Sequence, residues 1–175
     1  MRFEPLPIEG AWHVVAEPST DERGAFARTW CADEFAAHGI DVRVAQTSTS
    51  WNVRRGTLRG LHLQREPHGE GKLVRCTRGR AFDVLVDLRP GPGRLRWVGI
   101  ELAADERNSV WAPPGVAHGF LTLEDATELA YQMTVAYEPA AAYGVRWDDP
   151  SIGVTWPFEP VVISERDRSW PDVER

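Results

Sequence analysis

Lysine is nearly absent from this chain of 175 residues: of its 20 Lys and Arg residues, only Lys72 is a lysine. A guanidinium is a wide fork that suits carboxylates and phosphates, whereas an ammonium is a compact point charge whose proton affinity responds to burial. A lone lysine marks a position where a fork would fail, or it survived by chance in a GC-rich gene. The residues around Lys72 are needed to distinguish a functional lysine from one that is present by chance.

Cysteine and long apolar runs are also scarce. Cys31 and Cys76 lie far apart with no C-x-x-C spacing, which excludes the usual zinc and disulfide frameworks and predicts buried thiols. No stretch approaches the roughly 18 apolar residues that a membrane span needs. The first residues, Met1 to Glu4, lack the apolar core of a secretion signal. We therefore predict a cytoplasmic protein without a membrane partner.

The net charge of −6 argues against a surface that binds nucleic acid. A small anionic ligand needs only a local group of cations. Basic residues are concentrated in one segment, where they form either such a group or a solvated strand face: Arg54, Arg55, Arg59, Lys72, Arg75, Arg78 and Arg80.

The distribution of glycine and proline predicts an all-β protein. The 13 prolines and 15 glycines separate apolar runs of only four to eight residues, which is typical of many short strands. The length suits a single domain over residues 1–175. One short N-terminal helix is expected from about Cys31 to His38, with Gly39 placed to end it.

Two strands separated by a turn at Gly79 are predicted between Lys72 and Leu88. Lys72, Val74 and Cys76 share one face of the first, so the lysine is expected to point into a cavity lined by small and apolar groups. Further strands are expected at residues 97–102, 109–112, 120–123 and 128–137. This pattern predicts a double-stranded β-helix, the jelly-roll barrel, with a turn-rich segment after Pro139 that wraps it.

Two histidine segments carry the first chemical signal. Gly56 to Gln64 holds His62 between glycines that allow close backbone approach, and Pro113 to Phe120 is a tight turn that leads into His118. The second segment resembles a motif of the cupin superfamily, whose metal-binding members carry His-x-His in the first segment. Gln64 stands here in place of the second His. Two imidazoles fall short of a usual catalytic metal site, so we predict no metal and no cofactor.

A His, a Lys, a Tyr and an Asp in one pocket suit proton abstraction next to a carbonyl. An ammonium stabilises the developing enolate, which explains why Lys72 is not an arginine. Histidine supplies a base that titrates near neutrality, and a carboxylate fixes its tautomer. Epimerisation also needs an acid on the opposite face, which a tyrosine provides.

Several segments, in order along the chain, resemble the dTDP-4-dehydrorhamnose 3,5-epimerase family. They cover nearly the whole chain: residues 21–24, 56–62, 71–75, 82–84, 117–120, 144–150 and 164–167. The resemblance implies a metal-free cupin-like barrel, usually a homodimer, that epimerises a 4-keto-6-deoxy sugar carried on a nucleoside diphosphate.

The resemblance also implies a role for individual residues. His62 would be the base, Asp167 its partner, Lys72 the enolate stabiliser and Tyr131 the acid, with Tyr137 as the competing aromatic. Substrate contacts would come from Arg59, Arg23 of the partner subunit, His118, Phe26 and Gln46. The bidentate guanidiniums would hold the diphosphate.

Three questions stay open at this point. The family often has an Asn two residues after the Gln at position 46, where this chain has Ser48, so the number of epimerised carbons and the nucleotide base are not assigned. A 3-only or 5-only epimerase, or a 3,4-ketoisomerase, is an alternative of the same class. A non-catalytic sugar-nucleotide-binding cupin is the alternative of a different class.

Overall fold

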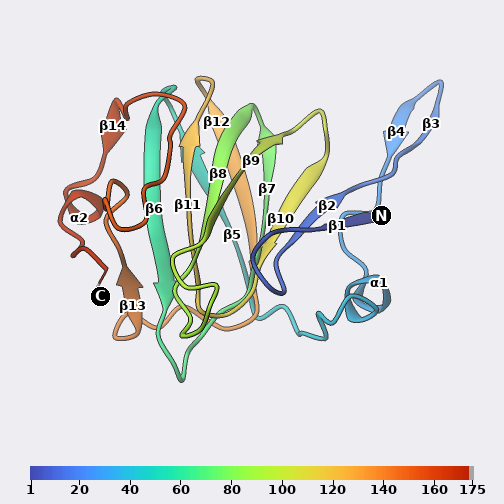
Figure 1. The fold of residues 1–175 in the computed structure, drawn as a ribbon. Helices are drawn as coiled ribbons and strands as arrows, with labels where there is room; N and C mark the ends of the chain where they lie inside the picture. Colours follow the sequence, from blue (N-terminus) through green and yellow to red (C-terminus); the bar gives the residue numbers. More distant parts are fainter. Residues whose placement is uncertain (174–175) are drawn as a thin grey trace.

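Two facing antiparallel sheets form a barrel in the computed structural model, which describes residues 1–173 (Figure 1). This confirms the predicted all-β jelly roll. In the described residues no helix is long and apolar enough to cross a membrane. The strands follow short apolar runs, and their successive side chains point to opposite faces.

The first sheet has the order β1-β2-β10-β7-β12-β5 within residues 1–173. Its strands are β1 (Arg2–Pro5), β2 (Trp12–Val15), β10 (Asn108–Ala112), β7 (Lys72–Arg78), β12 (Thr127–Met133) and β5 (Gln46–Asn52).

The second sheet has the order β13-β6-β11-β8-β9 in the same part of the chain, with β14 pairing in parallel with β6. Its strands are β13 (Ala142–Gly144), β6 (Thr57–Gln64), β11 (Val116–Thr122), β8 (Arg80–Asp87), β9 (Trp97–Ala103) and β14 (Val162–Ile163).

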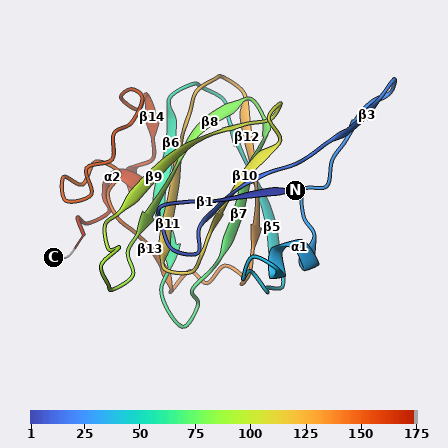
Figure 2. The ribbon, with the colours of Figure 1, turned by 45° about the vertical axis from the view of Figure 1, so that its right-hand side comes forward.

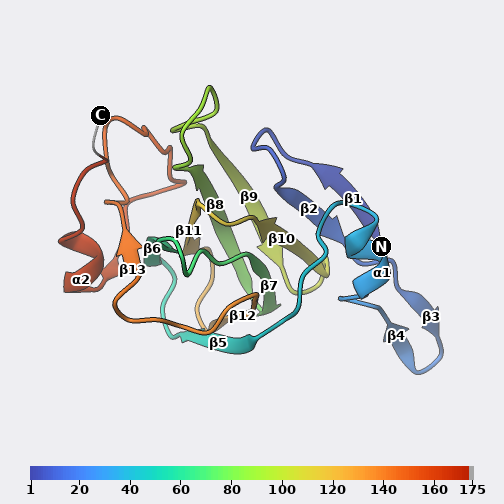
Figure 3. The same ribbon diagram turned by 90° about the horizontal axis from the view of Figure 1, so that it is seen from below.

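A hairpin and two short helices lie outside the barrel. The hairpin of β3 (Ser19–Asp21) and β4 (Gly24–Phe26) projects away from the sheets in every view (Figures 1 and 2). Helix α1 (Ala32–Ala36) lies on the same side of the molecule, whereas α2 (Glu165–Arg168) lies at the opposite side, beside β6 and β13 (Figure 3). The N-terminal hairpin and α1 thus lie on one side of the barrel, and the C-terminal helix α2 lies on the opposite side.

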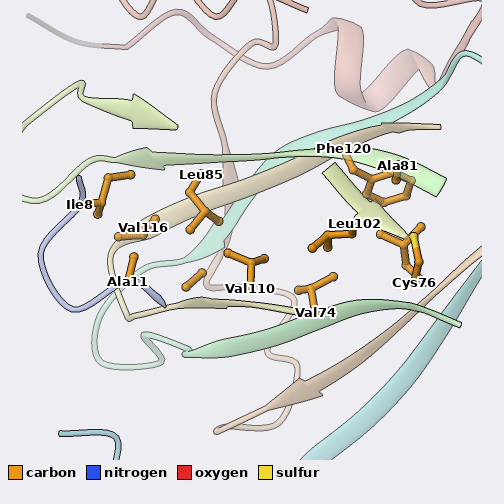
Figure 4. Close-up of a cluster of buried hydrophobic side chains, with 12 residues drawn as sticks. Ile8, Ala11, Val74, Cys76, Ala81, Leu85, Leu102, Val110, Val116 and Phe120 are labelled. Carbon is orange, nitrogen blue, oxygen red and sulfur yellow. The ribbon is translucent and has the colours of Figure 1, made fainter. Parts of the chain in front are cut away.

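The apolar core fills the space between the sheets. We call this group the interior cluster; Figure 4 shows it, and its buried members are Ile8, Ala11, Val74, Cys76, Ala81, Leu85, Leu102, Val110, Ala112, Val116, Phe120 and Leu129. The members come from both sheets, so packing across the barrel holds the sheets together. The cluster leaves the side of the barrel near β5 and β6 free for polar residues.

Two smaller clusters cover the outer faces of the sheets. Leu73 and Trp111, on the outside of the first sheet, pack with Phe35 of α1. Leu61, Val84 and other residues on the outside of the second sheet pack with the C-terminal segment. The central strands are therefore buried on both faces, and β11 is buried at every position.

The structure differs from the predicted elements in several places. The strand expected at 120–123 begins at Val116, and the one expected at 128–137 ends at Met133. The strands on either side of Gly79 do not pair: β7 belongs to the first sheet and β8 to the second, so Gly79 lies at a corner between them. The segment after Pro139 does more than wrap the barrel, because β13 and β14 extend the second sheet beside β6.

Candidate active site

A cavity of about 360 Å³ opens beside the interior cluster. It lies between β5 and β12 of the first sheet and β6 and β11 of the second. Polar and charged side chains dominate its lining, which includes Gln46, Ser48, Ser50, Arg59, His62, Gln64, Glu70, Lys72, His118, Tyr131, Tyr137, Arg166 and Asp167. Eight of the ten residues predicted for the site therefore meet in one cavity.

His62 and Asp167 form a hydrogen-bonded pair in this cavity, with 2.6 Å between Nε2 and Oδ1. An ionised carboxylate only accepts hydrogen bonds, so Nε2 carries the proton and Nδ1 is the basic nitrogen of the neutral ring. His62 comes from β6, and Asp167 lies 105 residues later in α2. The pair thus has the geometry of a base and its orienting carboxylate.

The first turn of α2 holds Asp167 in place and keeps it ionised. The Ser164 hydroxyl caps the helix by accepting a hydrogen bond from the Asp167 backbone N–H. Burial raises the pKa of the Asp167 carboxyl, but hydrogen bonds from His62, Ser164 and the Gly60 backbone outweigh burial and lower the pKa below its usual value. Asp167 is therefore a carboxylate at neutral pH.

Lys72 lies at the start of β7 and is buried. Its Nζ donates to the backbone carbonyl of His62 at 3.1 Å and lies 2.7 Å from Oε1 of Glu70. Lys72 shares a face with Val74 and Cys76 as predicted, but most of the residues that line its cavity are polar or charged and not small and apolar. The single lysine of the chain places its ammonium beside the backbone of the candidate base.

Tyr131 lies on β12 with its ring edge-on to His118, the centroids being 5.9 Å apart. Burial raises the pKa of its hydroxyl, which keeps the group protonated at neutral pH. Tyr137 also lines the cavity, but it follows the end of β12 and is 52% exposed. The expectation that both tyrosines share one strand is wrong, and Tyr131 is the deeper of the two.

A second His–carboxylate pair lies behind the first. Nε2 of His118 is 2.7 Å from Oδ2 of Asp83, and both side chains are buried. Burial raises the pKa of Asp83 more than the nearby His118 and Lys72 lower it. In the described residues no donor reaches Oδ1 of Asp83, so this carboxyl is held less completely than Asp167.

This chain is similar to known proteins in both sequence and structure. The family model described as dTDP-4-dehydrorhamnose 3,5-epimerase matches residues 5–175. The chain belongs to this family. The family identified from the sequence motifs is thereby confirmed, and the chain is an enzyme of the epimerase class rather than a binding protein alone.

Individual relatives of this epimerase support the assignment. A dTDP-4-dehydrorhamnose 3,5-epimerase of Methanothermobacter thermautotrophicus is 44% identical over 97% of this chain and 92% of its own length. A dTDP-4-dehydrorhamnose 3-epimerase of Streptomyces niveus is 40% identical over 96% of this chain and 82% of its own. The crystal structure of a 4-keto-6-deoxy sugar epimerase from the novobiocin biosynthetic gene cluster of Streptomyces spheroides superposes with a TM-score of 0.93, at 39% identity, over 98% of this chain and 87% of its own.

Arg59 enters the cavity of the epimerase through an irregularity in β6. Strict alternation would place Arg59 and His62 on opposite faces, but the register between β6 and β11 shifts at this point. Gly60 and Gly119 permit the shift, since a Cβ on Gly60 would lie 2.6 Å from the Gly119 Cα. Asn52 then fixes the guanidinium, with 2.8 Å from Arg59 Nε to its Oδ1.

Of the other residues predicted to contact the substrate, one lies at the cavity and two lie outside it. Gln46 lies at the mouth of the cavity, where its Oε1 accepts from the Tyr137 backbone N–H at 3.0 Å. Arg23 and Phe26 lie on the hairpin of β3 and β4, outside the cavity of their own chain. The side chain of Arg23 is 85% exposed and Phe26 is 81% exposed. A single chain does not bring these two residues to the site.

Three charged residues of the site were given no role by the sequence analysis: Glu70, Asp83 and Arg166. Glu70 lies two positions before Lys72, and side chains at this spacing in an extended chain point to the same face. This spacing could have predicted that Glu70 also lies in the cavity. Asp83 faces the interior from β8, between Ala81 and Leu85. Arg166 precedes Asp167 in α2, and its guanidinium lies 5.2 Å from the centre of the Trp170 ring.

Gln64 stands in place of the second histidine of the metal-binding cupin motif, and its side chain forms hydrogen bonds with backbone groups. Its Nε2 donates to the carbonyls of His68 and Ala136, and its Oε1 accepts from the Glu138 backbone N–H at 2.6 Å. The amide therefore joins two loops at the cavity. Within residues 1–173, no three His, Cys, Asp or Glu side chains are grouped closely enough to hold a metal ion.

Proposed function

We propose that the protein epimerises C3 and C5 of dTDP-4-dehydro-6-deoxyglucose to form dTDP-4-dehydrorhamnose. The observation that carries the proposal is the His62–Asp167 pair, which shares its cavity with the ammonium of Lys72 and the hydroxyl of Tyr131. A site that only bound the sugar nucleotide would need neither a base nor an acid.

His62 removes the proton from the carbon next to the C4 ketone. Its Nδ1 takes up the proton, and the C–H electron pair moves to form the enolate with its charge on the C4 oxygen. The ionised Asp167 stabilises the imidazolium that results. Proton loss depends on this carboxylate, because without it neither the tautomer nor the charge of the ring would be held.

Lys72 stabilises the enolate oxygen. Removing one such donor from an active site typically lowers kcat by about 10²- to 10³-fold. The compact ammonium fits the buried start of β7 between Glu70 and the His62 backbone, where a planar guanidinium would need more room. This explains the single lysine of the chain.

Tyr131 returns a proton to the opposite face of the same carbon, which inverts its configuration. Its raised pKa supplies the protonated form at neutral pH. After each cycle the phenolate regains a proton from solvent and the imidazolium loses one. Repetition at the second carbon gives the double epimer.

The diphosphate is held by Arg59 and, in a homodimer, by the hairpin of the partner subunit. The support for the second part is that Arg23 and Phe26 stand exposed on a hairpin that projects from the barrel (Figure 2). Mixing Arg23→Ala and His62→Ala chains tests this: mixed dimers would contain one complete site and regain activity that neither variant has alone. No recovery in a mixture that forms dimers would exclude the shared site.

A 3-only epimerase is the second candidate, favoured by the Streptomyces niveus relative with that activity. Incubation with dTDP-4-dehydro-6-deoxyglucose in deuterated water, followed by NMR, separates the two. Deuterium at C3 and C5 supports the double epimerase, and deuterium at C3 alone supports the restricted enzyme. An absence of deuterium at both carbons would reject this substrate, and CDP- and GDP-linked ketosugars would then be compared.

A further inference from the structure

Glu70 is the nearest anionic partner of Lys72 and has no place in the proton transfers described above. It is 9% exposed, and its Oε1 lies 2.7 Å from Nζ of Lys72. Both side chains line the cavity. A carboxylate buried beside an ammonium is costly to desolvate, so its position calls for a reason other than stability alone.

The backbone between the two residues is held rigidly. Gly71 donates its N–H to Oγ1 of Thr134 at 2.9 Å, and its carbonyl accepts from the Thr134 backbone N–H at 3.1 Å. Trp111 packs so closely that a Cβ on Gly71 would lie 2.5 Å from its ring. Alternation then directs Glu70 and Lys72, on either side of Gly71, to the same face.

The hydrogen bonds of the ammonium leave one direction free for a ligand. A lysine ammonium has three N–H donors. Glu70 and the His62 carbonyl occupy two of them, and no third acceptor binds Nζ among the residues from 1 to 173. Lys72 lines the cavity, so the remaining N–H can serve an oxygen of a molecule bound there.

Asp83 offers the ammonium a competing position. Lys72 lies near enough to help lower the pKa of this buried carboxyl, and Oδ1 of Asp83 has no donor in the described structure. Without Glu70, the flexible lysine side chain could turn toward Asp83 and away from the cavity. Glu70 opposes this rotation because its carboxylate holds Nζ at 2.7 Å.

We infer that Glu70 is a positioning residue that holds the Lys72 ammonium so that its third N–H meets the keto oxygen of the substrate. This inference rests on the proposed function, in which Lys72 stabilises the enolate. Glu70 touches Lys72 and not the reacting carbon, so it acts through the lysine. Its contribution belongs to the chemical step, where the enolate charge develops, more than to substrate binding.

The experiment compares Glu70→Ala, Glu70→Gln, Lys72→Met and the double variant Glu70→Ala/Lys72→Met in the full-length protein. We expect Glu70→Ala to lower kcat by about 10- to 100-fold, since misplacement of a catalytic group by about 1 Å costs up to about 10²-fold. KM should change by less than about threefold. Glu70→Gln retains an acceptor at the same distance and should recover part of the loss.

The double variant tests whether Glu70 acts through Lys72. In the Lys72→Met background, Glu70→Ala should change kcat by less than about twofold, because the group that it positions is already gone. Equal slowing of the wild-type and Lys72→Met proteins would overturn the inference, as would wild-type kcat in folded Glu70→Ala. A Glu70→Ala protein that does not fold leaves the same comparison to Glu70→Gln, with and without Lys72→Met.

Different experimental results would contradict the role of Glu70 and the proposed function. A wild-type protein that exchanges no deuterium into any ketosugar contradicts the proposed function itself. An active wild type with an unimpaired Lys72→Met variant removes the lysine from the mechanism. An active wild type, an impaired Lys72→Met and an unimpaired Glu70→Ala reject the role of Glu70 alone.

Discussion

Strand β7 serves two different regions of the barrel interior. Lys72 faces the polar cavity, whereas Val74 and Cys76, on the same face of the strand, belong to the interior cluster. On β11, His118 lies in the cavity between Val116 and Phe120 of the cluster, and Phe120 lines both regions. On β7, one alternation, about 6.7 Å along the strand, therefore separates the candidate catalytic lysine from the apolar core.

Cys76 in the interior cluster and Asp167 in the cavity have pKa shifts of opposite direction. In the interior cluster, burial raises the pKa of the Cys76 thiol to about 12, so that the thiol is neutral and acts as a small apolar side chain. In the cavity, hydrogen bonds lower the pKa of Asp167 despite its burial. A charged group survives near the core only where donors are directed at it.

Replacement of His62 by Ala should give the largest effect on the polar side. Loss of the base is expected to lower kcat by about 10³- to 10⁴-fold. The free energy of unfolding should fall by no more than about 1.5–3 kcal/mol, because the change removes a hydrogen bond to the Asp167 carboxylate and leaves the interior cluster intact. Deuterium exchange by NMR and calorimetry measure the two quantities. Substantial exchange in the variant would show that another group is the base.

Replacement of Leu129 by Ala should give the converse result. Leu129 is fully buried in the interior cluster, and its truncation is expected to lower the free energy of unfolding by about 2–5 kcal/mol. The kcat of the folded protein should remain within about twofold of wild type, since Leu129 does not line the cavity. Urea denaturation measures the loss, with Leu129→Met as the volume-matched control. A large fall in kcat at full folding would contradict the separation of the two regions.

Replacement of Tyr131 by Phe should uncouple exchange from inversion. The base still removes the proton, but no acid returns one to the opposite face, so we expect inversion to slow by about 10²-fold. Deuterium should continue to enter with retention of configuration. Tyr137→Phe is the matched control, because its ring lies at the exposed mouth of the cavity. Stronger impairment in the control would reverse the assignment of the acid.

Replacement of Asp167 by Asn should give a smaller, pH-dependent effect on stability. The folded-state pKa of Asp167 lies below the usual value of 3.8, so the ionised carboxylate stabilises the folded protein above that pH. At pH 7 we expect a loss of about 1.5–3 kcal/mol, typical of a hydrogen bond to a charged group. The difference should shrink as the pH falls below 3.8 and the wild-type carboxylate is protonated. Urea denaturation between pH 7 and pH 3 checks this, and a constant difference would exclude the hydrogen bonds to the ionised carboxylate as its cause.

The sequence predicted some features of the site and could not predict others. Alternation along β7 correctly placed Lys72 on the buried face with Val74 and Cys76. The strand predicted to reach Tyr137 ends at Met133, so Tyr137 lines the cavity from the segment after β12 and not from the strand. Alternation gave no reason for Arg59 and His62 to share a cavity, since their spacing requires the register shift at Gly60.

The sequence by itself determined the all-β class and the family, and it supplied the proposal for the proton-transfer residues, because these depend on short motifs and on the period of a strand. Only the tertiary structure decided which charges meet. Asp167 reaches His62 across 105 positions, and the corner at Gly79 places Lys72 and Asp83 in facing sheets. Such pairings depend on how the two sheets pack and on where α2 lies, and local sequence preferences carry no information about either.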